Sequence, residues 1–328
     1  MRMLKGCRAV VTGGAGFIGS YLTEELLNRK CQVTVVDNFS AGTMENIQRL
    51  VKNSCLKVVR EDLKNPRKLD RIVEEHDLIF HLAANPEVRV GQTVPKVHFE
   101  ENVLVTFNLL EAVRRSETEK TFVFASTSTV YGEASEIPTP EDYGPLIPIS
   151  TYGASKLASE ALIASYVHTF GLKGLVLRLA NVVGPRSNHG VIFDFIKKII
   201  ADPEELEILG DGMQEKSYLY ITDLVGAIMH LTERCLEGSG KTAIYNVGSK
   251  DSVTVKEIAR MVAEEMDVSK IRFRFTGGVD GGRGWKGDVK KMQLSIKKLL
   301  DSGWKPQYSS RRAVELTARE LVRELRKS

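Results

Sequence analysis

The stretch Thr12-Gly13-Gly14-Ala15-Gly16-Phe17-Ile18-Gly19-Ser20 decides the fold of this chain. It follows a short run of β-branched residues and precedes a helical pattern, so it joins a strand to a helix. Gly13 permits a tight turn, Gly16 lets the backbone approach a pyrophosphate, and Gly19 lets the helix pack closely on the strand. The N–H groups that begin the helix would then hold the phosphates.

A glycine triplet by itself is weak evidence, since the same residues can form a simple turn. Asp37 strengthens the prediction, because it ends the next predicted strand 18 residues after Gly19. A carboxylate there can accept hydrogen bonds from the adenosine ribose, whereas a 2′-phosphate would meet a like charge, so NAD is favoured over NADP. The alternative is that Asp37 only forms a turn, since residues 37–42 have turn chemistry.

The first half of the chain alternates short apolar runs with amphipathic segments. The runs are nearly continuous in apolar residues, as in parallel strands that are buried on both faces: Ala9–Thr12, Gln32–Val36, Leu56–Val59, Asp77–Leu82, Thr121–Ala125 and Gly174–Leu179. Helices are predicted between them at Ile18–Leu27, Val103–Arg115 and Thr151–Phe170. This alternation predicts right-handed βαβ units and an α/β fold with a doubly wound parallel sheet.

The second half is less regular, and we expect it to form a smaller unit. Its predicted helices are Ile192–Ala201, Thr222–Leu236, Val255–Glu265 and Ser310–Arg326, its predicted strands are Ala243–Val247 and Ile271–Phe275, and Gly277–Gly284 is a loop. We therefore expect a cofactor-binding domain over residues 1–180. Residues 181–328 would be mainly a substrate-binding cap, with some segments returning to the first domain.

Composition and charge exclude several classes of protein. The chain has 328 residues, 42% of them hydrophobic and 27% charged, with a net charge of +4, which is ordinary globular composition without a nucleic-acid footprint. No apolar run approaches the roughly 20 residues of a membrane span, and the N-terminus lacks a signal peptide's apolar region, so we expect a cytoplasmic protein. The 4 cysteines and 6 histidines show no ligand spacing, so no metal site is predicted.

Tyr152-Gly153-Ala154-Ser155-Lys156 places a phenol and an ammonium one turn apart on one helix face. A cation beside a phenol stabilises the phenolate and lowers the pKa of Tyr152 from about 10, which would suit a general acid/base. The same spacing occurs on ordinary surface helices. Here, however, the preceding strand ends in the hydroxyl-rich run 126–129, at the sheet edge where ligands bind in such folds.

At this point the chain resembles the extended short-chain dehydrogenase/reductases, the NAD-dependent nucleotide-sugar epimerase/dehydratase family, over nearly its whole length. Besides the glycine turn and Tyr152/Lys156, the shared motifs are Asp37-Asn38, Glu61-Asp62-Leu63, His81-Leu82-Ala83-Ala84, Asn102 with Thr106–Ala112, Val130-Tyr131-Gly132, Arg178–Arg186 and Gly210-Asp211-Gly212. The resemblance implies a Rossmann domain followed by a smaller α/β substrate-binding cap.

The resemblance also implies roles for individual residues. The cofactor contacts would be Gly13, Gly16, Phe17, Ile18, Asp37, Asn38, Ser40, Gly42, Asp62, Leu63, Leu82, Ala83, Ala84, Asn102, Ala125, Tyr152 and Lys156. The catalytic residues would be Thr127, Tyr152 and Lys156, and the substrate contacts Thr127, Tyr152, Asn181, Lys216, Arg283 and Lys286. The alternatives are that Asn102 caps a helix and that residues 82–84 are simply small core residues.

The reaction is narrowed by the residues that follow the fifth strand. In the family that the chain resembles, members that eliminate water carry an Asp-Glu pair at this place, and decarboxylating members carry a glutamate. This chain has Thr127-Ser128-Thr129 instead. Without a carboxylate pair, elimination lacks its acid and base. The resemblance is therefore closest to the UDP-glucose (galactose) 4-epimerases. We expect C4 epimerisation of a UDP-hexose with NAD that stays bound, and Met292, which is unbranched, would leave room for an N-acetyl group.

Other functions are compatible with the same motifs. The chain could be a dehydratase, a decarboxylase or a reductase acting on a nucleotide sugar. It could also be a non-catalytic NAD-sensing protein, although such a protein should have lost Thr127, Tyr152 or Lys156, and all three are present. The predicted cap differs from that of the best-known epimerases in the residues that would bind the diphosphate. Lys216 and Lys286 lie near positions where those enzymes use arginine, and a lysine offers a point charge rather than the two-pronged contact of an arginine.

A homodimer is also expected. The predicted helices Val103–Arg115 and Thr151–Phe170 carry apolar residues on more than one face, so both need a cover on the side away from the sheet. In relatives the cover is the same helix pair of a second subunit, which makes a symmetric four-helix interface. The alternative is a monomer whose cap folds over these helices.

Overall fold

The computed structural model describes residues 4–238 and 242–325, and the chain divides into two compact units. Unit 1 consists of Met1–Val130, Thr151–Arg178 and Val225–Tyr245. Unit 2 consists of Tyr131–Ser150, Leu179–Leu224 and Asn246–Ser328. The chain therefore passes between the two units more than once.

Unit 1 is built on a seven-stranded sheet with the order β11-β6-β5-β4-β1-β2-β3. The pairs joining β1 to β2, β2 to β3, β1 to β4 and β4 to β5 are all parallel. The strands are β1 (Arg8–Thr12), β2 (Gln32–Asp37), β3 (Leu56–Arg60), β4 (Leu78–His81), β5 (Thr121–Thr127), β6 (Lys173–Leu179) and β11 (Ala243–Val247). The predicted doubly wound parallel sheet is confirmed, and every strand predicted for it is present.

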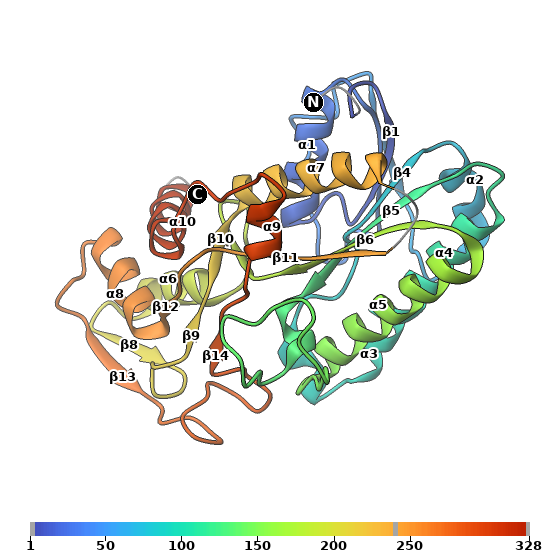
Figure 1. Cartoon of the computed structure of the whole chain (residues 1–328). Coiled ribbons are helices and arrows are strands. Elements are labelled where there is room, and N and C mark those ends of the chain that lie inside the picture. Colours follow the sequence, from blue (N-terminus) through green and yellow to red (C-terminus); the bar gives the residue numbers. More distant parts are fainter. Residues whose placement is uncertain (1–3, 239–241, 326–328) are drawn as a thin grey trace. The chain divides into compact units, whose positions relative to one another are not determined.

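Helices cover both faces of this sheet, with α4 and α5 on one face and α1 and α7 on the other (Figure 1). They are α1 (Phe17–Asn28), α2 (Leu69–Glu74), α3 (Lys96–His98), α4 (Val105–Arg115), α5 (Thr151–Phe170) and α7 (Ile221–Glu237). Short 3₁₀ turns lie at Pro66–Lys68, Val88–Gln92 and Ser128–Tyr131. The predicted helix Val103–Arg115 begins inside a π-helix, Phe99–Leu104, and π turns are frequent at functional sites.

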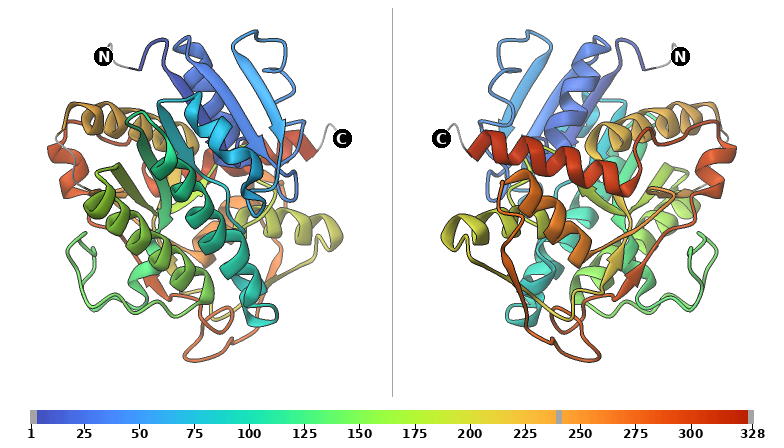
Figure 2. Two further views of the ribbon diagram at one scale, coloured as in Figure 1. Left: turned by 90° about the vertical axis from the view of Figure 1, so that its right-hand side faces the viewer. Right: turned by 90° about the vertical axis from the view of Figure 1, so that its left-hand side faces the viewer.

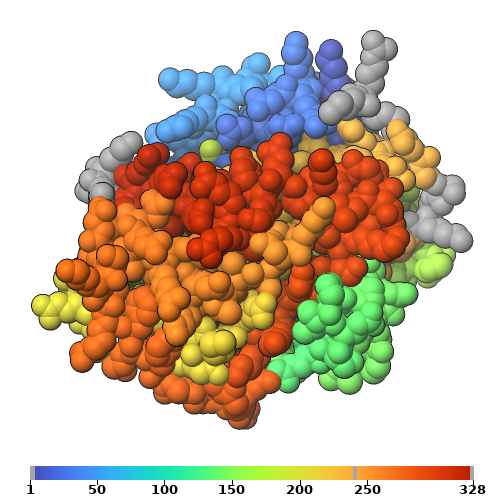
Figure 3. Space-filling view, turned by 60° about the vertical axis from the view of Figure 1, so that its left-hand side comes forward, coloured from blue at the N-terminus to red at the C-terminus, as the bar shows by residue number. Residues whose placement is uncertain are grey.

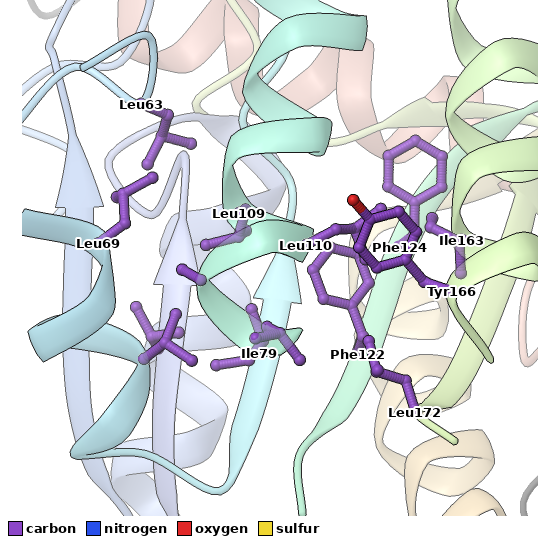
Figure 4. Packing of buried hydrophobic residues seen from close by; sticks show 14 of the residues in the cluster. Leu63, Leu69, Ile79, Leu109, Leu110, Phe122, Phe124, Ile163, Tyr166 and Leu172 are labelled. Carbon is purple, nitrogen blue, oxygen red and sulfur yellow. The ribbon is translucent and has the colours of Figure 1, made fainter. Parts of the chain in front are cut away.

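The core of unit 1 lies between the sheet and the helices α2, α4 and α5. Figure 4 shows Leu110 of α4 next to Phe122 of β5, with Leu109 of α4 on one side of them and Ile163 of α5 on the other. All four are almost fully buried. Burial of a side chain of this size contributes about 1.5–3 kcal/mol, so this cluster holds α4 and α5 on the sheet.

Unit 2 contains four helices and several short strands among its described residues. The helices are α6 (Val191–Ala201), α8 (Val255–Glu265), α9 (Lys297–Asp301) and α10 (Ser310–Leu325), and the predicted residue Arg326 lies outside the described residues. The strands are β7 (Asn181–Val183), β8 (Glu205–Ile208), β9 (Glu215–Lys216), β10 (Tyr218–Tyr220), β12 (Val253–Thr254), β13 (Arg272–Phe275) and β14 (Lys291–Met292). They pair as β10-β7, β12-β9-β14 and β13-β8.

Segments that are far apart in sequence meet within unit 2. Helix α10 packs on α8 and α6, and Figure 2 shows α10 beside α8. The Thr139 N–H donates to the Gln293 carbonyl at 2.9 Å and the Ser295 N–H donates to the Thr139 carbonyl at 2.9 Å. In Figure 3 the green segment 131–150 accordingly lies against the red-orange chain of the 290s. Within residues 4–238 and 242–325, no helix is both long and apolar enough to cross a bilayer.

Candidate active site

The glycine turn closes as its sequence predicts. Gly13 has a φ of +68°, and a Cβ there would lie 2.8 Å from the backbone nitrogen of Ala83. A Cβ on Gly19 would lie 2.1 Å from the Gly13 carbonyl oxygen, so the first and third glycines pack directly on each other. Helix α1 then begins at Phe17, with Gly16 as its N-cap and Ile18 in its first turn. Gly16 has no side chain to cap this helix, so the first N–H groups of α1 can bind an anion.

Asp37 stabilises the turn that follows β2, as the alternative to cofactor binding predicted. This contact does not exclude a cofactor role for Asp37. Its Oδ2 accepts a hydrogen bond from the Ala15 N–H at 2.9 Å, and its Oδ1 accepts one from the Phe39 N–H at 2.8 Å. The carboxylate is buried at the end of β2 and joins the glycine turn to the next loop. Each carboxylate oxygen has a second lone pair, so both oxygens can still accept hydrogen bonds from a ribose.

The loops after β2 and β3 meet at the same edge of the sheet. The Asn38 amide donates to Asp62 at 3.4 Å, and the Ser40 hydroxyl donates to the Asn38 Oδ1 at 2.8 Å. A Cβ on Gly42 would lie 2.7 Å from the Ala15 carbonyl carbon, so this loop presses against the glycine turn. Leu63 is buried in the core cluster behind Asp62. These contacts bring the residues predicted around adenosine into one cluster.

The end of β4 is held by a buried hydrogen-bonded chain through His81. The Thr106 hydroxyl donates to the Asn102 carbonyl at 2.6 Å, so it accepts from the His81 Nε2–H, 3.0 Å away. The Thr12 hydroxyl therefore donates to the His81 Nδ1 at 2.8 Å and accepts from the Ala83 N–H at 3.3 Å. Burial lowers the pKa of His81 to about 3, so the ring is neutral. The segment Leu82-Ala83-Ala84 is thereby fixed beside the glycine turn.

Asn102 links β4 to α5 rather than capping a helix. It lies in the π-helix, where its Oδ1 accepts from the Asn85 N–H and its amide donates to the Ser155 hydroxyl, both at 2.8 Å. Ser155 in turn donates to the Tyr152 carbonyl at 2.7 Å. The side chain of Asn102 therefore helps to fix the first turn of α5.

The three predicted catalytic residues come together where β5 ends beside α5. The Thr127 hydroxyl forms a hydrogen bond with the half-buried Tyr152 side chain. The Lys156 Nζ donates to the Ala125 carbonyl at 2.9 Å and lies 4.7 Å from the centre of the Phe124 ring. Lys156 is buried, one turn after Tyr152 on the same helix. A hydroxyl, a phenol and an amine are thus held at the carboxyl edge of the sheet.

The pKa values of this cluster differ from the expectation. Burial raises the pKa of Tyr152 to about 12, and the hydrogen bond with Thr127 opposes this rise. Burial lowers the pKa of Lys156 to about 7, while the negative charge of Glu160 opposes this fall. The prediction that Lys156 brings the pKa of Tyr152 below 10 is therefore wrong for the protein alone, because desolvation of the phenol outweighs its hydrogen bond with Thr127.

Two side chains that were not predicted from the sequence lie next to these residues. The buried Glu160 accepts from Arg178 Nη2 at 2.8 Å and also from the Ser126 hydroxyl. The signal was available, because Glu160 follows Lys156 by four residues and so shares its helix face. The second group is His98, whose ring meets that of Tyr152 edge-on at 5.6 Å between centroids and whose Nδ1 is 2.9 Å from the Thr151 hydroxyl.

The residues predicted for the diphosphate lie in unit 2, and two of them are already paired. The Lys216 Nζ lies 2.5 Å from the buried carboxylate of Asp288, and Arg283 forms an ion pair with Glu133. Lys286 is exposed, two residues before Asp288. Asn181 is half-buried in β7, paired with Tyr218 of β10. The structure therefore groups the cofactor and catalytic residues in unit 1 and the other predicted substrate residues in unit 2.

Comparisons with known proteins agree with this architecture. The signature of the NAD dependent epimerase/dehydratase family matches residues 9–248. A solved UDP-galactose 4-epimerase is 44% identical, with a TM-score of 0.85 and coverage of 97% of this chain and 99% of that one. A UDP-glucuronic acid 4-epimerase from Bacillus cereus, solved with UDP-glucuronic acid and NAD, is 30% identical, with a TM-score of 0.86 and the same coverage.

Relatives with a different activity match as well. UDP-glucuronic acid decarboxylase 2 of Arabidopsis thaliana is 33% identical over 325 residues, which is 97% of this chain and 68% of that protein. The predicted NAD cofactor is confirmed, since the glycine turn, the start of α1 and Asp37 fit a dinucleotide and the matching family is NAD dependent. The extended resemblance noted in the sequence is likewise confirmed. From its fold, its site and these matches together, the chain belongs to the NAD-dependent epimerase/dehydratase family.

Proposed function

We propose that this chain interconverts UDP-glucose and UDP-galactose by epimerisation at C4 of the sugar. One observation carries the proposal: Thr127, which is bonded to Tyr152 with Lys156 one turn further along α5, is followed in the 3₁₀ turn after β5 by Ser128 and Thr129 rather than by carboxylates. This set can move a proton at a hydroxyl but offers no acid and base pair for elimination. The 44% identity to a UDP-galactose 4-epimerase supports the same choice.

In this proposal unit 1 holds NAD and unit 2 contributes the remaining contacts to the nucleotide sugar. The start of α1 and the glycine turn would bind the pyrophosphate, Asp37 the ribose hydroxyls, and the Asn38–Asp62 loops the adenine. Lys156 would hold the nicotinamide ribose with donors beyond the one that Ala125 accepts. When bound, NAD supplies an acceptor that takes the C4 hydride and returns it, together with a positive charge that favours the phenolate.

The protein's own part in the reaction is the movement of one proton. Tyr152 takes the proton from the C4 hydroxyl and later returns it, and the Thr127 hydroxyl binds the same oxygen. The raised pKa of Tyr152 suits the first half, because the phenolate of a phenol with a pKa of about 12 is a strong base for the C4 hydroxyl proton. Asn181 would orient the sugar so that either face of the oxidised ring can be presented.

Decarboxylation of UDP-glucuronic acid is the second candidate, because decarboxylases are 33% identical over 97% of this chain. The glycine turn and the tyrosine/lysine pair are motifs by which the chain resembles the whole family, so these features do not separate the two activities. The position that does is Ser128-Thr129, where a glutamate is expected in a decarboxylase. The chain has hydroxyls there, which favours epimerisation.

The residues proposed to bind the diphosphate differ from those of the best-known epimerases. Lys216 and Arg283 each already face a carboxylate, Asp288 and Glu133, so their charge is partly neutralised. We therefore propose a weaker hold on the diphosphate than arginines without such partners would give. Met292, in β14 opposite Lys216, can move aside because it is unbranched, so some turnover of UDP-N-acetylglucosamine is expected.

A symmetric homodimer through the α4–α5 face is part of the proposal. Exposed aromatic side chains lie on this side of unit 1: Phe99 in the π-helix, Phe107 on α4 and Phe170 at the end of α5. Ala154 and Ala161 are exposed on α5, which would let a second helix approach closely. Such an apolar face is unusual on a monomer. Light scattering that gives a single particle of 36.5 kDa at micromolar concentration would reject the dimer.

A panel of nucleotide sugars tests the activity. The purified protein is incubated with UDP-, GDP-, dTDP- and ADP-hexoses, with and without N-acetyl and C6-carboxylate groups, and the products are identified by NMR. C4 inversion of UDP-glucose is the expected result. Release of water or carbon dioxide from any of these sugars would overturn the proposal in favour of a dehydratase or decarboxylase.

A further inference from the structure

A buried ion pair lies one helical turn beyond Lys156. Glu160 and Arg178 are only 4% and 3% exposed. Arg178 donates to the Glu160 Oε2 twice, from Nη2 at 2.8 Å and from Nε at 3.1 Å. The desolvation of two buried charges roughly cancels their attraction, so such a pair is weak evidence for a role in stability. Its place beside Lys156 points instead to a role in the site.

Glu160 belongs to a regular set of contacts between β5 and α5. Three consecutive residues at the end of β5 are each bonded to residues four apart along α5, which therefore share one helix face. The pairs are Ala125 with Lys156, Ser126 with Glu160 and Thr127 with Tyr152. Of the three α5 side chains, the proposed reaction uses Tyr152 and Lys156, and Glu160 supplies the third contact that holds the strand end against the helix.

The charges around Lys156 account for an acidic side chain at position 160. Burial disfavours the ammonium form of Lys156, and the negative charge of Glu160 is the interaction that favours it. The other groups that face this position are Tyr152 on α5, the neutral His81 on β4 and the Phe124 ring on β5. Arg178 on β6 directs its guanidinium at Glu160. The carboxylate thus compensates in part for the burial of the ammonium.

We infer that Glu160 is a positioning residue of the site: held by Arg178, it fixes the end of β5 against α5 and keeps Lys156 protonated. The inference rests on the proposed function only in treating Tyr152 and Lys156 as the groups that act on the substrate. Its physical content is a charge relationship between Glu160 and Lys156, which can be measured without any turnover.

The test compares Glu160→Gln with Ser126→Ala in the full-length protein. Both variants disturb the contact between Ser126 and residue 160, but only the first removes the charge. The protonation of Lys156 is followed by NMR of protein labelled with ¹³C at the lysine Cε, and Lys156→Met identifies the signal. We expect the pKa of Lys156 to fall by about one unit or more in Glu160→Gln. In Ser126→Ala it should stay at the wild-type value.

Activity gives a second readout. Because Glu160→Gln makes Lys156 lose its proton more easily, the alkaline limb of the kcat/KM profile should move to lower pH, which a merely structural defect would not do. If Glu160→Gln does not fold because Arg178 is left unpaired, the double variant Glu160→Gln/Arg178→Gln removes both charges. We expect it to show the same direction of shift, reduced in size because one neighbouring cation is also lost.

The outcomes separate this inference from the proposed function. An unchanged pKa of Lys156 in Glu160→Gln and in the double variant would overturn the inference, whatever the enzyme's reaction. A lowered pKa in a protein that turns over no UDP-hexose would support the inference and overturn the proposed function instead.

Discussion

The Thr127 hydroxyl forms a hydrogen bond with the phenol of Tyr152 and so joins the end of β5 to the first turn of α5. This contact is the one interaction that lowers the pKa of Tyr152 against the effect of burial. It makes the hydroxyl of Thr127 responsible for how readily the phenol gives up its proton.

Replacing Thr127 by valine keeps the shape of the side chain but removes this hydrogen bond. The pKa of Tyr152 should then rise further, so less phenolate is present at any given pH. We expect kcat to fall by about 10- to 100-fold, as for the loss of one hydrogen bond to a charged group, and the acidic limb of the activity profile to move to higher pH. Thr127→Ser keeps the hydroxyl and should stay near the wild type. An unshifted profile in Thr127→Val would contradict the role given to the contact.

Tyr152→Phe removes the phenolic oxygen without creating a large cavity. Turnover of UDP-galactose should fall by at least about 100-fold, in line with the loss of a general acid/base. The NAD content of the protein should not change, because the other predicted cofactor contacts remain. A coupled assay of UDP-glucose formation measures the rate, and near-normal turnover would show that another group moves the proton.

NAD should remain bound through purification, since the proposed reaction regenerates it in each cycle. Denaturing the protein and assaying the supernatant should release NAD⁺ and NADH without prior addition. Asp37→Ala loses the acceptors for the Ala15 and Phe39 N–H groups as well as for the ribose, so it should retain much less cofactor than Asp37→Asn, which keeps one acceptor oxygen. Recovery of NADP(H) alone from the wild type would contradict the choice of NAD.

Buried His81 should make the fold sensitive to acid. Its pKa is about 3 in the native state and about 6.5 in an unfolded chain, so between these values only the unfolded state binds the proton. The free energy of unfolding should therefore fall as the pH drops below about 6.5, by about 1.4 kcal/mol per pH unit from this group. Urea unfolding at several pH values measures the slope. His81→Asn should show a smaller slope, and an equal slope would assign the acid sensitivity to other groups.

The Lys216–Asp288 pair gives a prediction for unit 2. Lys216→Met would leave the buried carboxylate of Asp288 unpaired and should lower the free energy of unfolding by about 3 kcal/mol. Adding Asp288→Asn should recover most of this loss, because no buried charge then remains. Thermal and urea unfolding of the two variants test the pair, and a single variant as stable as the wild type would show that Asp288 is solvated by other means.

Much of unit 1 could be predicted from the sequence because its signals are local. Six of the seven strands of the sheet are nearly continuous apolar runs, and the helix predicted at Thr151–Phe170 is found with the same bounds. The glycine turn is equally local, since a positive φ at Gly13 and close packing at Gly19 exclude side chains at those positions. The pair Tyr152 and Lys156 follows from helical spacing alone. These features depend on neighbouring residues, so they can be read along the chain.

The short strands of unit 2 could not be predicted in this way. Strands such as β9 and β14, with two residues each, are too short to show any alternation, and they form because they pair with partners far along the chain. The ion pairs of Lys216 and Arg283 were missed for the same reason, since Asp288 and Glu133 are 72 and 150 residues away.

The sequence by itself determined the alternation of strands and helices along unit 1, the dinucleotide turn and the identity of the groups at the end of β5. Only the tertiary structure decided their chemistry: burial sets the pKa of Tyr152 at about 12 and that of Lys156 at about 7, and Glu160 and Arg178 become neighbours of the site. Solvation and charge act through space, so they depend on which distant residues the fold brings together and how much water it removes.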